Sequence, residues 1–344
     1  MTENTKANAV VRRARNRRAM TILAMLAATS IVLTSCGKSS STVSDAQLPE
    51  VTTQGKAEVT TPVENAPVDT VADTTVPEET TADAAVTTAK GSGTSIINAS
   101  DSSGKRDVAA LRKKNADVVG YVYIPGTKID EPVMQTMLAK YNDAHYYYER
   151  DFNKKASKDG SIYATPLDEI TATDPGPTNL ILYGHNMASG KMFANVHYYK
   201  DGGKNAVSYY QKHPLIYVDT IARKATFKIF AVFMADTDSS AGLASNFELT
   251  YHQKVNFTSE SDFNSYLKEI RDRSYLDIPA VDVKYGDQLV MLSTCASRTR
   301  EMEDGKIVLV GRMVREGESD EVDTSTAALN TDKVMPARYV KIHG

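Results

Sequence analysis

Seven short runs of β-favouring residues, separated by Gly, Pro, Asn and Asp, follow one another through the later part of this chain. They cover residues 118–124, 161–164, 179–183, 216–219, 226–234, 288–294 and 306–314. Many short strands with frequent turn residues are typical of a β-barrel or a β-sandwich. The sequence therefore predicts a mainly β domain.

Two segments have helical rather than strand periodicity. Residues 107–115 place apolar side chains on one side and stop before Gly120. Residues 259–270 begin with Ser259, a residue type that caps helix N-termini. One face of this second helix carries Phe263, Leu267 and Ile270.

The segment 36–104 differs in composition from the rest of the chain. It has no aromatic residue, and it carries ten Asp and Glu against three Lys. Such a stretch buries too little apolar surface to offset its ordering entropy. We expect a disordered, acidic tether rich in Thr, Ala, Val and Pro, a folded domain over residues 105–316, and a flexible polar tail over 317–344. Although 344 residues suffice for two domains, one folded domain fits this pattern better.

The N-terminus predicts export. Five arginines between residues 12 and 18 precede an uncharged, mostly apolar run over 19–33, a length typical of a signal-peptide core. The run ends in Leu33-Thr-Ser-Cys36, which resembles a bacterial lipobox, so residues 1–35 are a predicted signal peptide with Cys36 as the lipidation site. An uncleaved signal anchor is the alternative. Both place the domain outside the cell, anchored to the outer face of the membrane.

Charge and cysteine content exclude some classes. Cys36 and Cys295 are the only cysteines, whereas secreted domains stapled by disulfides normally have four or more. The net charge is −3, and the part after residue 104 is close to neutral, which argues against nucleic acid as a partner. The pattern contains no metal-ligand cluster.

Two strand ends carry residues suited to nucleophilic chemistry. An apolar run ends at Cys295, and Arg298 and Arg300 just beyond it favour the thiolate. Another apolar run ends at Gly184 and His185. A Cys–His pair can activate a thiol. The alternatives are a cysteine buried as a small apolar residue and a structural histidine, and spacing alone does not bring the two ends together.

Several motifs in order resemble class B sortases, the cysteine transpeptidases of Gram-positive bacteria. The histidine segment is Tyr183-Gly-His-Asn-Met187, and the cysteine segment is Leu292-Ser-Thr-Cys295 with the strand from Lys306. Further matches are Val119-Gly-Tyr-Val-Tyr-Ile-Pro-Gly-Thr127, Gly160-Ser-Ile-Tyr163 and His213-Pro-Leu-Ile-Tyr-Val218. The resemblance runs from about residue 106 to 316.

The resemblance implies a closed sortase β-barrel of about eight strands with a few added helices. It implies that Cys295 cleaves a C-terminal sorting signal through a thioacyl intermediate, with His185 transferring protons. The acyl group then passes to an amine, from a peptidoglycan precursor or a pilin lysine. Partners would be surface proteins bearing the sorting motif, that amine acceptor and the membrane. No cofactor is implied.

One position departs from the family pattern. Sortases carry an Arg at the start of the strand after the cysteine loop, where this chain has Lys306. Lys306 is the first candidate for stabilising the oxyanion, and Arg298 or Arg300 is the alternative. Ser293 and Arg300 are candidate contacts for the bound peptide, and Ala296 is a candidate backbone donor.

Two other functions stay open at this point. The chain could be a cysteine endopeptidase, in which water resolves the intermediate. It could also be a weakened sortase-fold lipoprotein that binds sorting signals without turning them over, since Lys replaces Arg at position 306.

Overall fold

The computed structural model describes residues 104–200, 205–296 and 302–344. The predicted signal peptide, Cys36 and nearly all of the predicted tether lie outside these residues, as do Arg298 and Arg300. The expectations made for them remain predictions.

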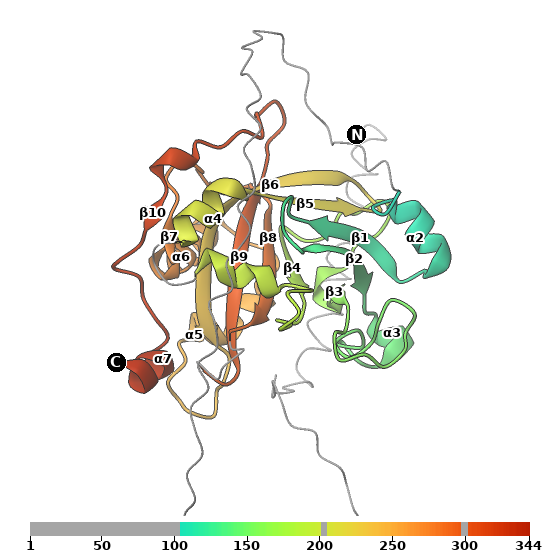
Figure 1. Cartoon of the computed structure of the whole chain (residues 1–344), viewed down its shortest axis with the longest axis horizontal. Coiled ribbons are helices and arrows are strands. Elements are labelled where there is room, and N and C mark those ends of the chain that lie inside the picture. The colour runs from blue at the N-terminus through green and yellow to red at the C-terminus, as the bar shows by residue number, and fades with distance from the viewer. Residues whose placement is uncertain (1–103, 201–204, 297–301) are drawn as a thin grey trace, which may run out of the picture. The chain divides into compact units, whose positions relative to one another are not determined.

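The described part of the chain is built around a closed barrel (Figure 1). Its strands, in the order β1-β2-β3-β4-β8-β9-β6-β5, close on one another. Their bounds are β1 Val118–Tyr123, β2 Asp130–Gln135, β3 Ile162–Ala164, β4 Asn179–Tyr183, β5 Leu215–Thr220, β6 Lys224–Asp236, β8 Leu289–Cys295 and β9 Gly305–Met313. The prediction of an eight-stranded closed barrel is confirmed, and a β-sandwich is excluded.

Most neighbouring strands are antiparallel, but β2 with β3 and β4 with β8 are parallel pairs. The central strands β8 and β9 are buried along most of their length. Their side chains fill the barrel on one face and are covered by helices and loops on the other. Burial on both faces explains why these strands appear in the sequence as continuous apolar runs rather than as alternating patterns.

Strand β2 was missed because it contains Asp130, Glu131 and Pro132. Proline cannot donate to a sheet ladder and normally argues against an inner strand. Here the parallel pairing with β3 begins only at Val133, which faces Ile162. Pro132 therefore lies in the part of β2 that pairs with β1 alone.

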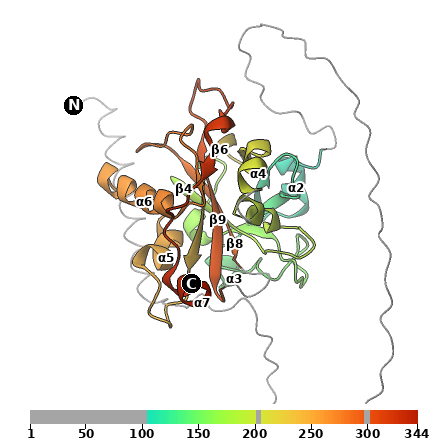
Figure 2. The same ribbon diagram turned by 60° about the vertical axis from the view of Figure 1, so that its left-hand side comes forward.

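Helices cover the barrel on two sides, with α5, α6 and α7 on one and α2 and α3 on the other (Figures 1 and 2). The α-helices are α2 Val108–Lys114, α3 Leu138–Tyr141, α4 Ala206–Lys212, α5 Asn246–Thr250, α6 Glu260–Arg273 and α7 Ala337–His343. Short 3-10 turns are η1 Pro166–Asp168, η2 Ala194–Tyr199, η3 Tyr251–Gln253 and η4 Thr324–Thr326.

Both predicted helices are confirmed. In α6 the Ser259 side chain accepts a hydrogen bond from the Asp262 N–H at 3.2 Å, which satisfies one of the free donors of the first turn. Phe263 and Ile270 are buried as expected. Tyr266 is buried with them, while Leu267 is only partly covered.

Residues 317–344, for which we expected a flexible tail, contact the folded domain in the structure. Strand β10 (Ala328–Leu329) pairs with β7 (Leu276–Asp277), and Met335 and Tyr339 pack against the core. In α7, the Arg338 guanidinium forms two hydrogen bonds with the Asp236 carboxylate, at 2.6 and 2.9 Å. The segment looked mobile because its sequence is polar, and its anchoring groups contact residues far away in the chain.

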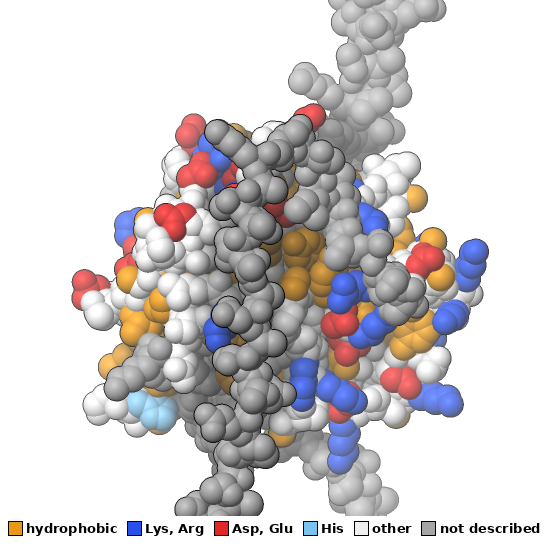
Figure 3. Space-filling view, turned by 45° about the horizontal axis from the view of Figure 1, so that its top comes forward, with side chains coloured by type: hydrophobic (Ala, Val, Ile, Leu, Met, Phe, Trp, Pro, Cys, Tyr) orange, Lys and Arg blue, Asp and Glu red, His pale blue; other side chains and the backbone are white. Residues whose placement is uncertain are grey.

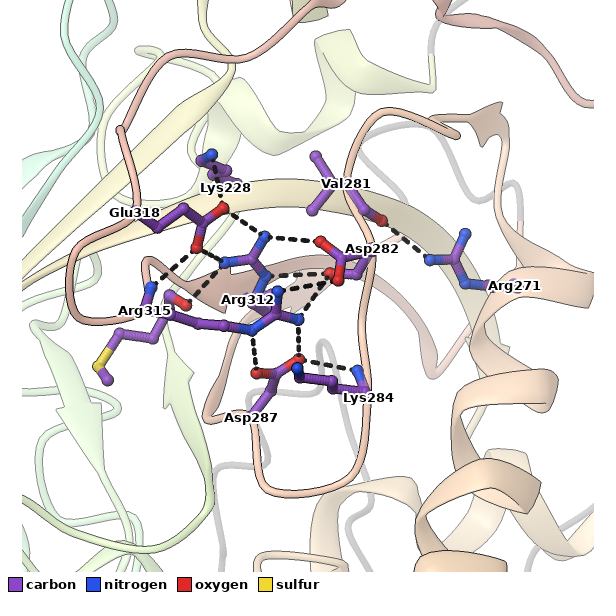
Figure 4. Close-up of polar contacts among 10 residues, drawn as sticks. Lys228, Arg271, Val281, Asp282, Lys284, Asp287, Arg312, Arg315 and Glu318 are labelled. Carbon is purple, nitrogen blue, oxygen red and sulfur yellow. Dashed lines mark hydrogen bonds and ion pairs between the residues drawn. The ribbon is translucent and has the colours of Figure 1, made fainter.

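A second ionic cluster holds the residues that follow β9 (Figure 4). The side chain of Arg312 is 1% exposed and pairs with Glu318, which also accepts a hydrogen bond from Lys228 at 2.7 Å. Arg315 binds Asp287 at 2.7 Å. A buried guanidinium needs such partners, because an unpaired charge inside the protein is costly.

The face drawn in Figure 3 has no field of a single charge sign. Lys and Arg side chains gather toward the right of that view, with Asp and Glu side chains between them. This mixture agrees with the near-neutral charge of the domain.

Candidate active site

The parallel pairing of β4 with β8 brings the two predicted strand ends together. The register runs from Asn179 opposite Leu289 to Tyr183 opposite Ser293, and the Gly184 N–H donates to the Ser293 carbonyl at 3.2 Å. His185 and Cys295 each follow two residues after the last pair. They therefore end adjacent strands at the same level, although they lie 110 positions apart in the sequence.

Lys306 joins them from the other side. In the antiparallel pair of β8 and β9, Cys295 lies directly opposite Lys306. The Lys306 Nζ is 3.8 Å from the Cys295 Sγ. Residues directly opposite each other share one face of a sheet, so the cation is held beside the sulfur by the strand register. The structure thus brings together His185, Cys295 and Lys306.

The backbone at the end of β8 is held by polar side chains. The Cys295 carbonyl accepts hydrogen bonds from Asn186 Nδ2 at 3.3 Å and from His197 Nε2 at 2.9 Å. Gly184 permits the close approach of this loop, because a Cβ there would lie 2.3 Å from Ile162 Cδ1. Asn186 therefore connects the histidine loop directly to the cysteine.

His185 is fixed by a loop between β2 and β3. Its Nε2 lies 2.7 Å from the Tyr148 carbonyl oxygen, and the Tyr148 ring lies 4.1 Å from the imidazole between centroids. Burial lowers the pKa of His185, and the Tyr148 carbonyl opposes this shift by favouring the protonated ring. The lowered pKa makes the neutral imidazole, which can accept a proton, the main form near pH 7.

The surroundings of Lys306 carry several titratable groups. Burial lowers the pKa of the Lys306 ammonium, and the nearby Asp304 carboxylate partly offsets the shift. The Lys306 charge in turn contributes to lowering the pKa values of His145 and His252, in both cases after the larger effect of burial. The pKa of His252 falls to about 4. These histidines are therefore neutral at physiological pH.

Ser293 lies on the same face of β8 as Cys295, two residues earlier. Its side chain is buried, and its hydroxyl lies 2.9 Å from the Tyr251 hydroxyl. The structure thus gives Ser293 an internal partner beside the site, and its contact with a peptide remains a prediction.

The expectation for Ala296 needs correction. Its N–H donates to the Gly305 carbonyl at 2.7 Å, and the residue is 1% exposed. This donor is used to close the base of the loop between β8 and β9, so it is not directed at an oxyanion. Lys306 is the cation whose Nζ lies beside the Cys295 sulfur.

Sequence reasoning missed the residues that surround this triad. Tyr148 and His145 come from the loop before β3, and Tyr251 and His252 from the η3 turn. The Nδ1 of His145 lies 2.8 Å from the Tyr163 hydroxyl. No spacing signal identifies them, because separate loops bring them to the end of β8.

Two kinds of feature are absent from the described residues. No helix among residues 104–200, 205–296 and 302–344 is long and apolar enough to cross a membrane. Within the same ranges, no three His, Cys, Asp or Glu side chains are grouped as metal ligands would be.

Comparisons with known proteins identify the family. The family model described as "Sortase domain" matches residues 122–314, more than half of the chain. Sortase B of Listeria monocytogenes is 29% identical over 204 residues, covering 59% of this chain and 72% of the relative. Sortase B of Staphylococcus aureus is 27% identical over 206 residues, covering 60% and 74%. The solved Staphylococcus aureus sortase B-substrate complex aligns with a TM-score of 0.50 and 26% identity, covering 61% of this chain and 86% of that one.

Proposed function

This chain belongs to the sortase family and to its class B, and on that premise we propose that it is a cysteine transpeptidase with Cys295 as nucleophile, His185 as proton-transfer group and Lys306 as the stabilising cation. The observation that carries the proposal is the strand register. The β4–β8 pair places His185 at the level of Cys295, and the β8–β9 pair places Lys306 opposite it.

The proposed reaction has two steps. His185 takes the proton of the Cys295 thiol, and the resulting thiolate attacks the carbonyl carbon of a threonine in the sorting signal. The C–N bond then breaks as His185 gives that proton to the leaving amine. The product is a thioester on Cys295. An incoming amine, from which His185 takes a proton, then attacks the thioester carbonyl, and the thiolate leaves. In both tetrahedral intermediates the Lys306 ammonium is placed to stabilise the negative oxygen.

Substrate class and location are part of the proposal. The substrates would be surface proteins with a C-terminal sorting motif, and the acceptor a cell-wall precursor amine or a pilin lysine. The related Staphylococcus aureus sortase B has been solved as a substrate complex, which supports a sortase-type substrate here. We also propose an extracytoplasmic domain anchored to the membrane through the N-terminal segment, with Cys36 lipidated.

The test is acyl-enzyme trapping. The reduced chain is incubated with peptides carrying candidate sorting signals and analysed by intact mass. Reduction keeps Cys295 as a thiol, since the proposed nucleophile is its thiolate. We expect a thioester adduct on the wild type, none on Cys295→Ala, and much less on His185→Ala.

The outcomes separate the alternatives. Transfer to an added amine supports the transpeptidase, whereas hydrolysis that added amines do not divert would indicate an endopeptidase. Binding of the peptides without any adduct, with Cys295 alkylatable, would contradict the proposal and indicate a binding protein.

A further inference from the structure

The loop between β2 and β3 contacts His185 through Tyr148 and lies close to it at Gly160. We propose that the Tyr148 carbonyl, brought into place by Gly160, holds His185 with its ring proton on Nε2 and so makes Nδ1 the atom that exchanges protons with Cys295 and the substrate amines. The inference rests on the proposed function. It assigns Tyr148 and Gly160 as positioning residues, since neither would touch the reacting atoms.

The assignment of the proton follows from the chemistry of the hydrogen bond. His185 Nε2 and the Tyr148 carbonyl oxygen are 2.7 Å apart. A carbonyl oxygen only accepts hydrogen bonds, so the ring nitrogen must be the donor. In the neutral imidazole only one nitrogen carries hydrogen, and the other, Nδ1, therefore has the free lone pair. A general base needs that lone pair.

Gly160 is the residue that permits this contact. Its φ is +60°, and a Cβ there would lie 2.1 Å from the Tyr148 oxygen, 3.0 Å from the Tyr148 carbonyl carbon and 3.1 Å from His185 Cδ2. No side chain fits without displacing the carbonyl or the imidazole. A glycine at this point is required by both its backbone conformation and its surroundings.

The loop is held by its own hydrogen bonds, so the carbonyl is a fixed feature. The Ser161 N–H donates to the Tyr147 carbonyl at 3.0 Å, and the Ser157 N–H donates to the Glu149 carbonyl at 2.9 Å. The Ser161 hydroxyl donates to the Arg150 carbonyl at 2.8 Å. These hydrogen bonds join the two segments of the loop to each other on both sides of Tyr148.

Charged groups from two elements also face His185. Glu149 and Asp159 of the same loop raise the pKa of His185, and Lys306 on β9 lowers it, each by less than burial or the Tyr148 hydrogen bond. Cys295 ends the neighbouring strand β8 at the same level as His185. Loss of the Tyr148 contact should lower the pKa of His185 further, because the protonated ring donates more strongly to that carbonyl.

The direct test is the tautomer of His185 in the reduced wild-type chain. Nitrogen-15 NMR of histidine-labelled protein distinguishes a nitrogen that bears hydrogen from one with a lone pair, and the His185→Gln spectrum identifies the resonances. We expect neutral His185 to carry hydrogen on Nε2. Hydrogen on Nδ1, or an even mixture, would overturn the inference without bearing on acyl transfer.

A matched pair of glycine variants tests the positioning role. Gly160→Ala should lower the pKa of His185 in the NMR titration and reduce kcat by about tenfold or more, with a smaller change in KM, since general acid–base catalysis contributes at least that much. Gly242→Ala is the control, because Gly242 has a φ of +62° but a Cβ there would meet no atom within 4 Å. We expect it to leave titration and rate unchanged.

A folded Gly160→Ala chain with an unaltered His185 titration and kcat would contradict the positioning role. If that variant does not fold, Tyr148→Leu replaces it as the probe. This change removes the ring contact but keeps the carbonyl, so the Nε2 tautomer should persist. A switch of tautomer in Tyr148→Leu would show that the ring, not the carbonyl, orients His185.

Discussion

Lys306 lies directly opposite Cys295 across the β8–β9 ladder, with its Nζ 3.8 Å from the Cys295 Sγ. A strand register is a rigid way to hold a cation beside a sulfur, since both backbones are fixed by ladder hydrogen bonds. Lysine supplies a compact charge on a flexible stem, whereas arginine supplies a planar fork of donors. The barrel partly offsets the flexibility of the lysine side chain by surrounding the Lys306 stem, which is only partly exposed.

We expect removal of this cation to impair catalysis strongly. Lys306→Ala should reduce kcat/KM by roughly 10²- to 10³-fold, the usual effect of deleting one oxyanion donor. Lys306→Arg should stay within about tenfold of the wild type, because it restores a cation at the same register position. Initial rates of peptide cleavage measure both, and Lys268→Ala, on the exposed side of α6, is the control. An unimpaired Lys306→Ala chain would move the role to Arg298 or Arg300.

The pH profile should report the same group. Burial lowers the pKa of Lys306 below its usual 10.5, so the cation is lost as pH rises through that lowered value. On the alkaline side, kcat/KM of the wild type should therefore decrease with a midpoint below pH 10.5. In Lys306→Arg that midpoint should move upward, since a guanidinium stays protonated. Identical alkaline limbs in the two proteins would count against Lys306 as the titrating cation.

Glu318 should link stability to acid pH. Its hydrogen bond from Arg312 lowers its pKa well below 4.5, against the opposing effect of burial. The stability that the Glu318–Arg312 ion pair contributes is fully present above pH 4.5, and it is lost as pH falls through the lowered pKa. Glu318→Gln should cost roughly 3 kcal/mol at neutral pH, the low end for breaking a buried pair, and clearly less at pH 3. Urea unfolding at both pH values measures this, with exposed Glu316→Gln as the control.

Arg338 should be needed for the stability of the barrel, although it lies near the C-terminus. It is the bidentate partner of Asp236, whose side chain is 0% exposed. Arg338→Ala should lower the free energy of unfolding by about 3–5 kcal/mol, since it leaves a buried carboxylate without its guanidinium. Thermal and urea unfolding measure the loss. Lys341→Ala in the same helix should be neutral, and equal losses in both variants would contradict the ion-pair explanation.

Local sequence patterns determined most of the strands and two helices of this protein. Continuous apolar runs, turn residues and the Ser259 cap depend only on residues that are close in the sequence. Strands β4 and β8 and helix α6 could therefore be predicted from the chain alone. Strand β2 could not be predicted in this way, because a sheet tolerates Pro132 only where it pairs with β1 and not with β3. The ordered C-terminal segment could not either, because Arg338 reaches a carboxylate about a hundred positions earlier.

The candidate site divides in the same way. His185, Cys295 and Lys306 could be singled out in the sequence, because each lies at or next to the end of a recognisable β-type run. The motifs around these three residues pointed to them as well. That they adjoin depends on two strand registers, which are set by the packing of the whole barrel. The Tyr148 carbonyl, the Tyr251 hydroxyl and the internal use of the Ala296 N–H were decided only by tertiary structure. Loops approach these groups from distant parts of the chain, and their contacts have no periodicity that a sequence can display.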